Sequence, residues 1–234
     1  VTDLDVRSYY NEQGSCMFTV AQSSGGARGI YTTSGPNGYT SNFGGTSAAS
    51  PLGAGIVGLL LSANPALTWR DVQHILVESA RKIDPGDTSW TTNAAGRDFN
   101  VNFGFGAVDA TAAVNLAMAW TNVTAEQVLD SGAQPVNASL PDNNASGVTR
   151  AFTEPASVVV EAVELILNVD HNFIGDLVVK LTAPSGTVST LTKQRGHSQD
   201  DFVNNVLTTL RSWGEDSAGT WTVNNSDQNA GTTG

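Results

Sequence analysis

Residues 44–51 carry the sequence Gly-Gly-Thr-Ser-Ala-Ala-Ser-Pro, and an apolar run over 52–63 follows directly. The composition of that run predicts a long apolar helix. The two glycines allow close backbone approach and dihedral angles that other residues avoid, so the hydroxyl of Ser47 would be displayed just before the helix. Pro51 suits the first turn of a helix, where its missing N–H costs little.

Ser47 is therefore the candidate nucleophile of the chain. Unpaired N–H groups and the positive end of the dipole at a helix start favour the negative charge of a carbonyl oxygen under attack. The Ser47 amide would thus donate to an oxyanion. The same residue types also cap ordinary helices, with Thr46 or Ser47 as a simple N-cap, and local chemistry leaves both interpretations open.

Length and composition indicate a globular protein. The chain has 234 residues, of which 40% are hydrophobic and 14% charged, enough to bury one or two cores. Its formal net charge of −11 argues against nucleic acid as a partner and suits cationic peptides. No run of eighteen apolar residues is present, so no membrane span is expected. The chain opens at Val1 without a signal peptide, as a processed protein or a piece of a longer one would.

Three successive segments resemble the subtilisin-like serine peptidases, and two of them indicate the kexin and furin branch. Gly-Thr-Ser-Ala-Ala-Ser-Pro at 45–51 is similar to the family's nucleophile segment. Asn-Pro-Ala-Leu-Thr-Trp-Arg-Asp-Val-Gln-His at 64–74 and Phe-Gly-Phe-Gly-Ala-Val-Asp-Ala at 103–110 resemble the branch's NPxLTWRDVQH and YGFGxxDA segments. The resemblance implies that residues 1–120 are the C-terminal part of an α/β subtilisin-like catalytic domain. It also implies a serine endopeptidase that acts on polypeptide substrates through an acyl-enzyme on Ser47.

In the order of this family the catalytic Asp and His precede the serine, and Ser47 lies too near Val1 to leave room for them. The resemblance therefore implies an Asp, a His and an oxyanion-hole Asn on an upstream segment. The chain alone is expected to be inactive. The three histidines present are expected in structural or surface roles: His74, His171 and His197.

Tyr10-Asn11-Glu12 resembles the Tyr-Ser-Glu motif of kexins, in which the glutamate helps to bind calcium near the primary specificity pocket. The resemblance makes Glu12 a candidate metal ligand and calcium the expected structural cofactor. One carboxylate is not a calcium site, so partner aspartates are expected upstream, and a solvated glutamate is the alternative. Asn11 in place of serine, and Phe43 where kexins tend to have histidine, depart from the family pattern.

Cys16 is the single cysteine, so no disulfide can form within the chain. One interpretation is a buried small apolar residue. The other, implied by the resemblance, is a bridge to an upstream cysteine, as in several kexin-like enzymes. No basic neighbour flanks Cys16 to activate its thiol.

Two further helices are predicted in the first half. Thr68 begins one of them with a pattern like a capping box, in which Asp71 stands in place of the usual Glu or Gln. Asp109 is expected to cap the other, from 110 to about 120.

The remaining segments of the first half predict loops and short strands. Residues 14–20 predict a short buried strand, and the Gly-, Ser- and Thr-rich run over 23–45 predicts loops around a hairpin. The stretch 84–96 lacks apolar periodicity and predicts a surface loop.

Beyond residue 120 the pattern changes from helical to strand-like. Alternating apolar residues over 163–169 and 177–182 predict strands of a β-sandwich. The run over 171–187, with later Trp-Gly-Glu and Gly-Thr-Trp motifs, resembles the P domain of proprotein convertases. The resemblance implies a P domain over 121–234, a jelly-roll-like sandwich that packs on the catalytic domain and lacks its last strand.

The main alternative is a catalytically dead subtilase-fold protein that acts as a binding or scaffolding module. An esterase is disfavoured because residues 45–49 lack the second glycine of G-x-S-x-G, and no His-Glu-x-x-His motif supports a metalloprotease. Cleavage after basic residues and a secreted or periplasmic location are implied by the resemblance alone. Four N-x-S/T triplets are compatible with secretion: Asn122, Asn137, Asn144 and Asn224.

Overall fold

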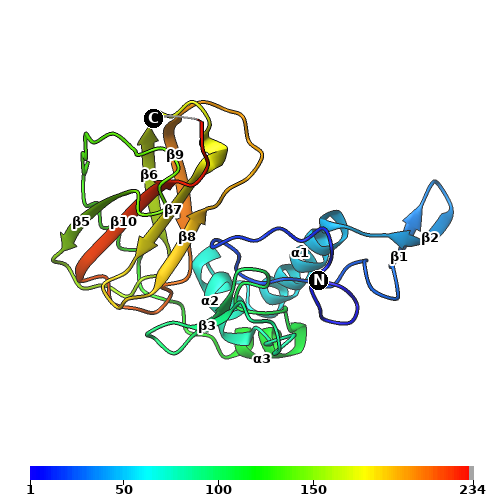
Figure 1. Cartoon of the computed structure of the whole chain (residues 1–234). Coiled ribbons are helices and arrows are strands. Elements are labelled where there is room, and N and C mark those ends of the chain that lie inside the picture. The colour runs from blue at the N-terminus through cyan, green and yellow to red at the C-terminus, as the bar shows by residue number, and fades with distance from the viewer. Residues whose placement is uncertain (232–234) are drawn as a thin grey trace. The chain divides into compact units, whose positions relative to one another are not determined.

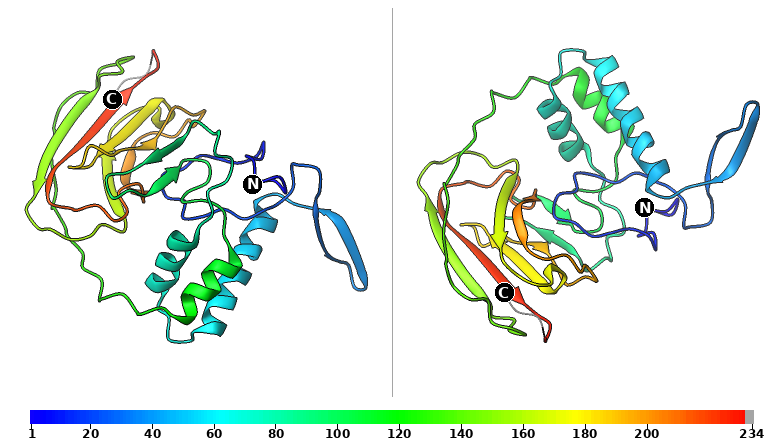
Figure 2. Two further views of the ribbon diagram at one scale, coloured as in Figure 1. Left: turned by 90° about the horizontal axis from the view of Figure 1, so that it is seen from below. Right: turned by 90° about the horizontal axis from the view of Figure 1, so that it is seen from above.

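The computed structural model describes residues 1–231 and divides into two compact units, which are drawn in Figures 1 and 2. The first unit comprises Val1–Thr91 and Asp98–Ala125. The second comprises Thr92–Arg97 together with Glu126–Gly234. The domain boundary expected after residue 120 stays a prediction, and the last residues of the predicted P domain, 232–234, lie outside the described residues.

Three helices build the core of the first unit: α1 (Thr46–Ala63), α2 (Trp69–Ser79) and α3 (Ala110–Met118). Helix α3 packs against both of the others, as Figure 2 shows. Their buried side chains form one cluster that includes Leu60, Ile75 and Ala113. Each fully buried leucine or isoleucine stabilises such a core by about 2 kcal/mol.

The predicted helix starts at Thr68 and Asp109 are confirmed. Thr68 and Asp71 form a complete capping box, because the Asp71 amide donates to Thr68 Oγ1 (3.3 Å) and the Thr68 amide donates to Asp71 Oδ2 (2.7 Å). Asp109 Oδ1 accepts from the Ala112 amide (2.9 Å). Both caps fix where the chain turns into a helix.

Helix α1 begins at Thr46 rather than at 52, which corrects the predicted start. Pro51 therefore lies inside the helix and not in its first turn. Proline has no N–H to donate to the carbonyl four residues before it, which here belongs to Ser47. The helix tolerates this loss near its N-terminus, where the bonds from the Ala48 and Ala49 amides to the Gly45 carbonyl (3.1 and 3.4 Å) have already closed the first turn.

Two short sheets complete the first unit. Strands β1 (Ile30–Ser34) and β2 (Gly38–Phe43) form the expected antiparallel hairpin. Strands β3 (Trp90–Thr92) and β4 (Asp98–Asn100) pair where a loop was predicted over 84–96, so that prediction is wrong in part. The strand predicted over 14–20 is also wrong, because Val20 pairs only through an isolated bridge to Ala107.

Helix α1 is unusually apolar and unusually exposed. Leu52, Leu59 and Leu61 are all exposed, whereas Leu60 is fully buried. By length and composition α1 is the one helix within the described residues that could cross a membrane, a criterion that the core helix of a soluble protein also meets.

Up to residue 231, the second unit is built from six strands in two antiparallel sheets. One sheet has the order β5-β10-β7-β8, and β6 pairs with β9 in the other. The strands are β5 (Val148–Glu154), β6 (Val163–Val169), β7 (Leu177–Thr182), β8 (Val188–Thr192), β9 (Phe202–Thr209) and β10 (Gly219–Asp227).

The two sheets enclose a shared apolar core, which confirms a β-sandwich. Leu177 of β7 and Phe202 of β9 are buried together, and Leu167 of β6 packs against them. The strands predicted over 163–169 and 177–182 are confirmed. Strand β7 lies between two neighbours and is buried along most of its length, whereas β6 alternates between half-buried and exposed residues.

Candidate active site around Ser47

Ser47 lies exposed in the first turn of α1, on a helix start that has no side-chain cap. The N-cap is Gly45, with φ 73° and ψ −174°, and no side chain caps the helix. A side chain at this positive φ would be strained, so the turn requires glycine. Thr46 and Ser47 lie inside the helix, and the interpretation of either one as an N-cap is wrong.

The backbone around Ser47 leaves donors unused. The Ala48 and Ala49 amides bond to the Gly45 carbonyl, whereas the Thr46 and Ser47 amides lie where the helix offers no acceptor. In the described part of the chain neither of these two amides has another partner. The first turn of α1 therefore presents a hydroxyl beside free N–H groups, which is the arrangement that stabilises an oxyanion.

The turn before Ser47 is held by two serines from the loop at 23–24. Ser23 Oγ donates to the Gly45 carbonyl (2.7 Å), and the Gly45 amide donates to Ser24 Oγ (3.0 Å). A Cβ on Gly44 would overlap the Ser24 side chain, so glycine is required for this close approach. Neither serine was predicted to hold this turn, because a loop rich in Gly, Ser and Thr carries no sign of which hydroxyls bind backbone.

Glu12 lies exposed on the N-terminal segment. Asn11 beside it is anchored by a hydrogen bond from its Nδ2 to the Asn102 carbonyl (2.9 Å). Within residues 1–231 no group of three or more His, Cys, Asp or Glu side chains is placed to hold a metal ion. Glu12 offers one carboxylate, and its role as a metal ligand stays a prediction.

The three histidines lie in settings that suit structural roles. His171 is buried in the second unit, where the Phe173 amide donates to its Nδ1 (3.1 Å) and its Nε2 lies 3.3 Å from Asp227 Oδ2. Nδ1 also lies 3.0 Å from the Phe173 carbonyl, so both ring nitrogens of His171 are engaged within the second unit. His74 lies half-buried beside the Trp120 ring, with 6.3 Å between the ring centroids, and His197 is half-buried in a loop.

Cys16 is exposed and free. The interpretation of Cys16 as a buried apolar residue is therefore wrong. A bridge to a cysteine elsewhere in the protein stays a prediction.

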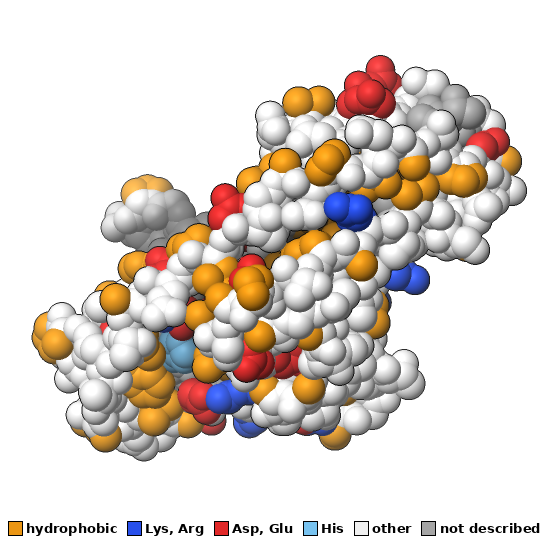
Figure 3. All heavy atoms as spheres, turned by 90° about the vertical axis from the view of Figure 1, so that its left-hand side faces the viewer, with side chains coloured by type: hydrophobic (Ala, Val, Ile, Leu, Met, Phe, Trp, Pro, Cys, Tyr) orange, Lys and Arg blue, Asp and Glu red, His pale blue; other side chains and the backbone are white. Residues whose placement is uncertain are grey.

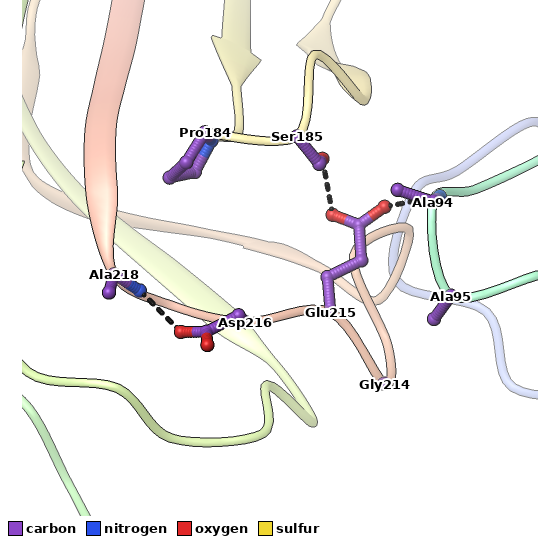
Figure 4. Close-up of a pocket in the computed structure, with 8 residues that line it drawn as sticks. All are labelled: Ala94, Ala95, Pro184, Ser185, Gly214, Glu215, Asp216 and Ala218. Carbon is purple, nitrogen blue, oxygen red and sulfur yellow. Dashed lines mark hydrogen bonds between the residues drawn. The ribbon is translucent and has the colours of Figure 1, made fainter.

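A shallow pocket in the second unit gathers around Glu215, and Figure 4 shows its carboxylate between Ser185 and Ala94. Glu215 Oε1 accepts from the Ala94 amide (2.8 Å) and from Thr187 Oγ1 (2.5 Å). Its Oε2 accepts from Ser185 Oγ (2.8 Å). With both oxygens occupied, this buried carboxylate serves to hold loops together and not to bind a ligand.

Comparison with known proteins defines the class of this chain. Residues 7–108 match the subtilase family, and residues 160–234 match the proprotein convertase P-domain. The chain therefore combines a segment of the subtilase family with a P-domain of the proprotein convertase type, which confirms the resemblance drawn from its motifs.

Particular relatives can also be named. The chain is 36% identical to mouse furin over 222 residues, which cover 92% of this chain and 28% of furin. It is 37% identical to human proprotein convertase subtilisin/kexin type 5 over 227 residues, which cover 93% of this chain and 12% of that protein. The chain thus spans less than a third of each of these relatives.

Solved structures support the fold class. The serine protease of Aeromonas sobria, in its complex with a chaperone, matches with a TM-score of 0.83 at 23% identity over 98% of this chain and 49% of that one. A second structure of that protease matches with a TM-score of 0.72 at 25% identity over 84% of this chain and 40% of that one. The predicted order, an α/β subtilase part followed by a β domain, is confirmed.

Proposed function

We propose that this chain is the nucleophile-bearing part of a furin-like serine endopeptidase and that Ser47 is its nucleophile. One observation carries the proposal: Ser47 is exposed on a glycine-capped helix start, next to two backbone amides that the helix leaves free. That geometry suits attack on a carbonyl carbon better than it suits a structural serine.

In this proposal Ser47 Oγ attacks the carbonyl carbon of a peptide bond, and a histidine outside this chain accepts the hydroxyl proton. The Thr46 and Ser47 amides face the oxygen that becomes negative. Collapse of the tetrahedral intermediate releases the amine, which takes the proton from the histidine. Water then hydrolyses the ester on Ser47 by the same route, and the free serine returns.

The rest of the catalytic domain would come from further segments of a longer protein, which supply the Asp, the His and the oxyanion Asn. The exposed leucines of α1 support this, because Leu52 (41% exposed), Leu59 (53%) and Leu61 (42%) offer apolar surface that further chain would cover. Under this proposal α1 is a packing helix and not a membrane span. A secreted or periplasmic location, with cleavage after basic residues, is part of the same proposal.

Polypeptides are the proposed substrates, and no nucleic acid is proposed as a partner. The net charge of −11 favours cationic peptides over polyanions. On the face drawn in Figure 3, Lys and Arg side chains do not join into a continuous basic surface. Glu12 is proposed as one ligand of a structural calcium ion whose other ligands lie outside this chain.

The test is labelling of the full-length protein with a fluorophosphonate, together with peptide cleavage. Ser47→Ala should abolish labelling and lower turnover by roughly a millionfold. Ser50→Ala is the matched control, because Ser50 is exposed on the same helix and should keep both activities. Labelling of another residue, or full cleavage by Ser47→Ala, would refute the proposal. A folded full-length protein that never reacts would favour a binding module.

A further inference from the structure

A cluster of hydroxyl groups lies directly behind the turn that carries Ser47. Tyr10 Oη donates to the Ser24 carbonyl (2.5 Å) and lies 3.3 Å from Ser24 Oγ. Ser8 Oγ donates to the same carbonyl (3.2 Å), and Ser8 is buried. These contacts join two segments of the first unit and fix the position of Ser24.

Ser24 in turn fixes the turn before the nucleophile. Its Oγ accepts from the Gly45 amide (3.0 Å), while Ser23 Oγ donates to the Gly45 carbonyl (2.7 Å). Both backbone polar groups of Gly45 are thereby held from one side. We call these contacts of Ser23 and Ser24 with Gly45 the clamp. Gly45 is the N-cap of α1 and lies two residues before Ser47, so the clamp acts close to the nucleophile in the chain.

The turn needs such a clamp for two reasons. Gly45 has φ 73°, and glycine loses more conformational freedom on folding than any other residue, so an unrestrained turn would sample other shapes. Gly44 also packs so closely on Ser24 that no side chain fits between them. A small shift of Ser24 would therefore also move Gly44 and Gly45.

The phenol of Tyr10 is embedded in this network. Burial alone would raise its pKa, but hydrogen bonds with the three surrounding serines and with the Gly45 backbone outweigh burial and lower it. The neighbouring Tyr9 provides a contrast, since it is 90% exposed and its ring only packs edge-on against Tyr10 at 5.0 Å between centroids.

We propose that Tyr10 and Ser24 are positioning residues that hold the turn at 44–45 in the shape from which Ser47 attacks. Tyr10 acts through Ser24, and Ser24 acts through the Gly45 amide. Neither residue touches the substrate. The inference rests on the proposed function of Ser47 and assigns a second role to the Tyr-Asn-Glu motif, whose glutamate alone was considered above.

Misplacement of a reacting group by about 1 Å can cost on the order of a hundredfold in rate. Loss of one hydrogen bond from the clamp is a smaller disturbance, so Tyr10→Phe and Ser24→Ala should each lower kcat by roughly tenfold. KM should stay within about twofold, because the clamp acts on the nucleophile and not on substrate binding.

The experiment uses the full-length protein with four variants: Tyr10→Phe, Ser24→Ala, the double variant, and Tyr9→Phe as the matched control. Active sites are titrated with a fluorophosphonate, and kcat is expressed for each titrated site. The rate of labelling at Ser47 should fall in parallel with kcat. Tyr9→Phe should leave both unchanged. The kcat of the double variant should be close to that of the slower single variant. Tyr10 acts through Ser24, so the two losses should not add.

The inference is overturned if kcat for each titrated site is unchanged in both single variants. It is also overturned if the fraction of titratable enzyme falls while kcat for each titrated site stays the same. That outcome would show that the cluster serves folding alone. Its failure is distinguishable from failure of the proposed function. Ser47→Ala tests the nucleophile itself, and an inactive Ser47→Ala beside a fully active Tyr10→Phe would refute the clamp alone.

Discussion

The amide nitrogen of Ala94 lies 2.8 Å from Oε1 of Glu215, although 121 positions separate the two residues in the sequence. Asn93 beside it donates through Nδ2 to the carbonyls of Arg211 and Trp213, both at 2.9 Å. These bonds explain why Thr92–Arg97 groups with the second unit and not with the residues on either side of it.

Removal of the Glu215 carboxylate should destabilise the second unit. Glu215→Ala leaves the Ala94 amide and the hydroxyls of Ser185 and Thr187 without their acceptor, in bonds that are partly buried, which should cost about 2 kcal/mol in the free energy of unfolding. Hydrogen exchange at the Ala94 amide should become faster. Glu164→Ala on the exposed side of β6 is the control and should change neither quantity. An unchanged exchange rate at Ala94 would show that the carboxylate does not hold the loop.

Asp71 should be far more sensitive to conversion into asparagine than Asp109. Asp71 is fully buried, and its two oxygens accept from Trp120 Nε1 (2.9 Å) and the Val123 amide (2.8 Å) as well as from Thr68. Asp71→Asn places an NH₂ group against these donors and should cost roughly 2 kcal/mol. Asp109→Asn keeps an equally good cap and should cost a few tenths of a kcal/mol. Urea unfolding of both variants measures the difference, and equal losses would contradict it.

Asp71 should also make the stability of the first unit depend on pH. Burial alone would raise the pKa of Asp71, but hydrogen bonds from Thr68, Val123 and Trp120 outweigh burial and lower it to about 2. The folded state therefore binds this proton less readily than the unfolded state. The stabilisation is complete well above the unfolded pKa of 3.8 and is lost as the pH falls through about 2. The midpoint of thermal unfolding, followed between pH 5 and 2, should fall less steeply in Asp71→Asn than in the parent protein.

Two glycines near Ser47 should respond to alanine in opposite directions. Gly45→Ala forces a side chain into φ 73° and should destabilise the turn by about 1 kcal/mol or more. Gly53 lies in the interior of α1 with open space around it, so Gly53→Ala should stabilise the helix in this chain by up to about 1 kcal/mol. Helical circular dichroism during thermal unfolding compares the two. Destabilisation by Gly53→Ala would show that another surface covers this face of α1.

His171 should be required for the stability of the sandwich, and His197 should not. Both His171 and Asp227 have fully buried side chains, so His171→Ala leaves a buried carboxylate without its imidazole partner. The expected loss is about 3 kcal/mol. The Nδ1 atom of His197 has no hydrogen-bond partner among the described residues, and His197→Ala should cost less than about 1 kcal/mol. Equal effects in urea unfolding would contradict the assignment.

Elements with a strong local pattern could be predicted from the sequence. The capping box at Thr68, the cap at Asp109 and the strands over 163–169 and 177–182 all follow from short-range rules, and the structure confirms them. The start of α1 was predicted too late in the sequence. Proline favours the first turn of a helix, but Pro51 lies further inside this one. The preceding glycine-capped turn is closed by bonds to Ser23 and Ser24, more than twenty residues earlier.

The candidate site was predictable only in part. The motif around Ser47 made it the candidate nucleophile, and the structure adds its exposure and the free amides beside it. The roles proposed for Tyr10 and Ser24 depend on contacts between segments that no local pattern encodes. The pairing of β3 with β4 was missed for a similar reason, because the loop between them is bound by Glu215, far away in the sequence.

The assignment of Thr92–Arg97 to the second unit has a consequence for how such proteins can change in evolution. The chain passes between the units three times, at 91/92, 97/98 and 125/126. A genetic exchange of the segment after Ala125 would replace most of the second unit. The loop Thr92–Arg97, which also belongs to that unit, would stay in the original chain. The two units are therefore expected to be inherited together, and a successful transplant of the sandwich would have to carry the hairpin loop with it.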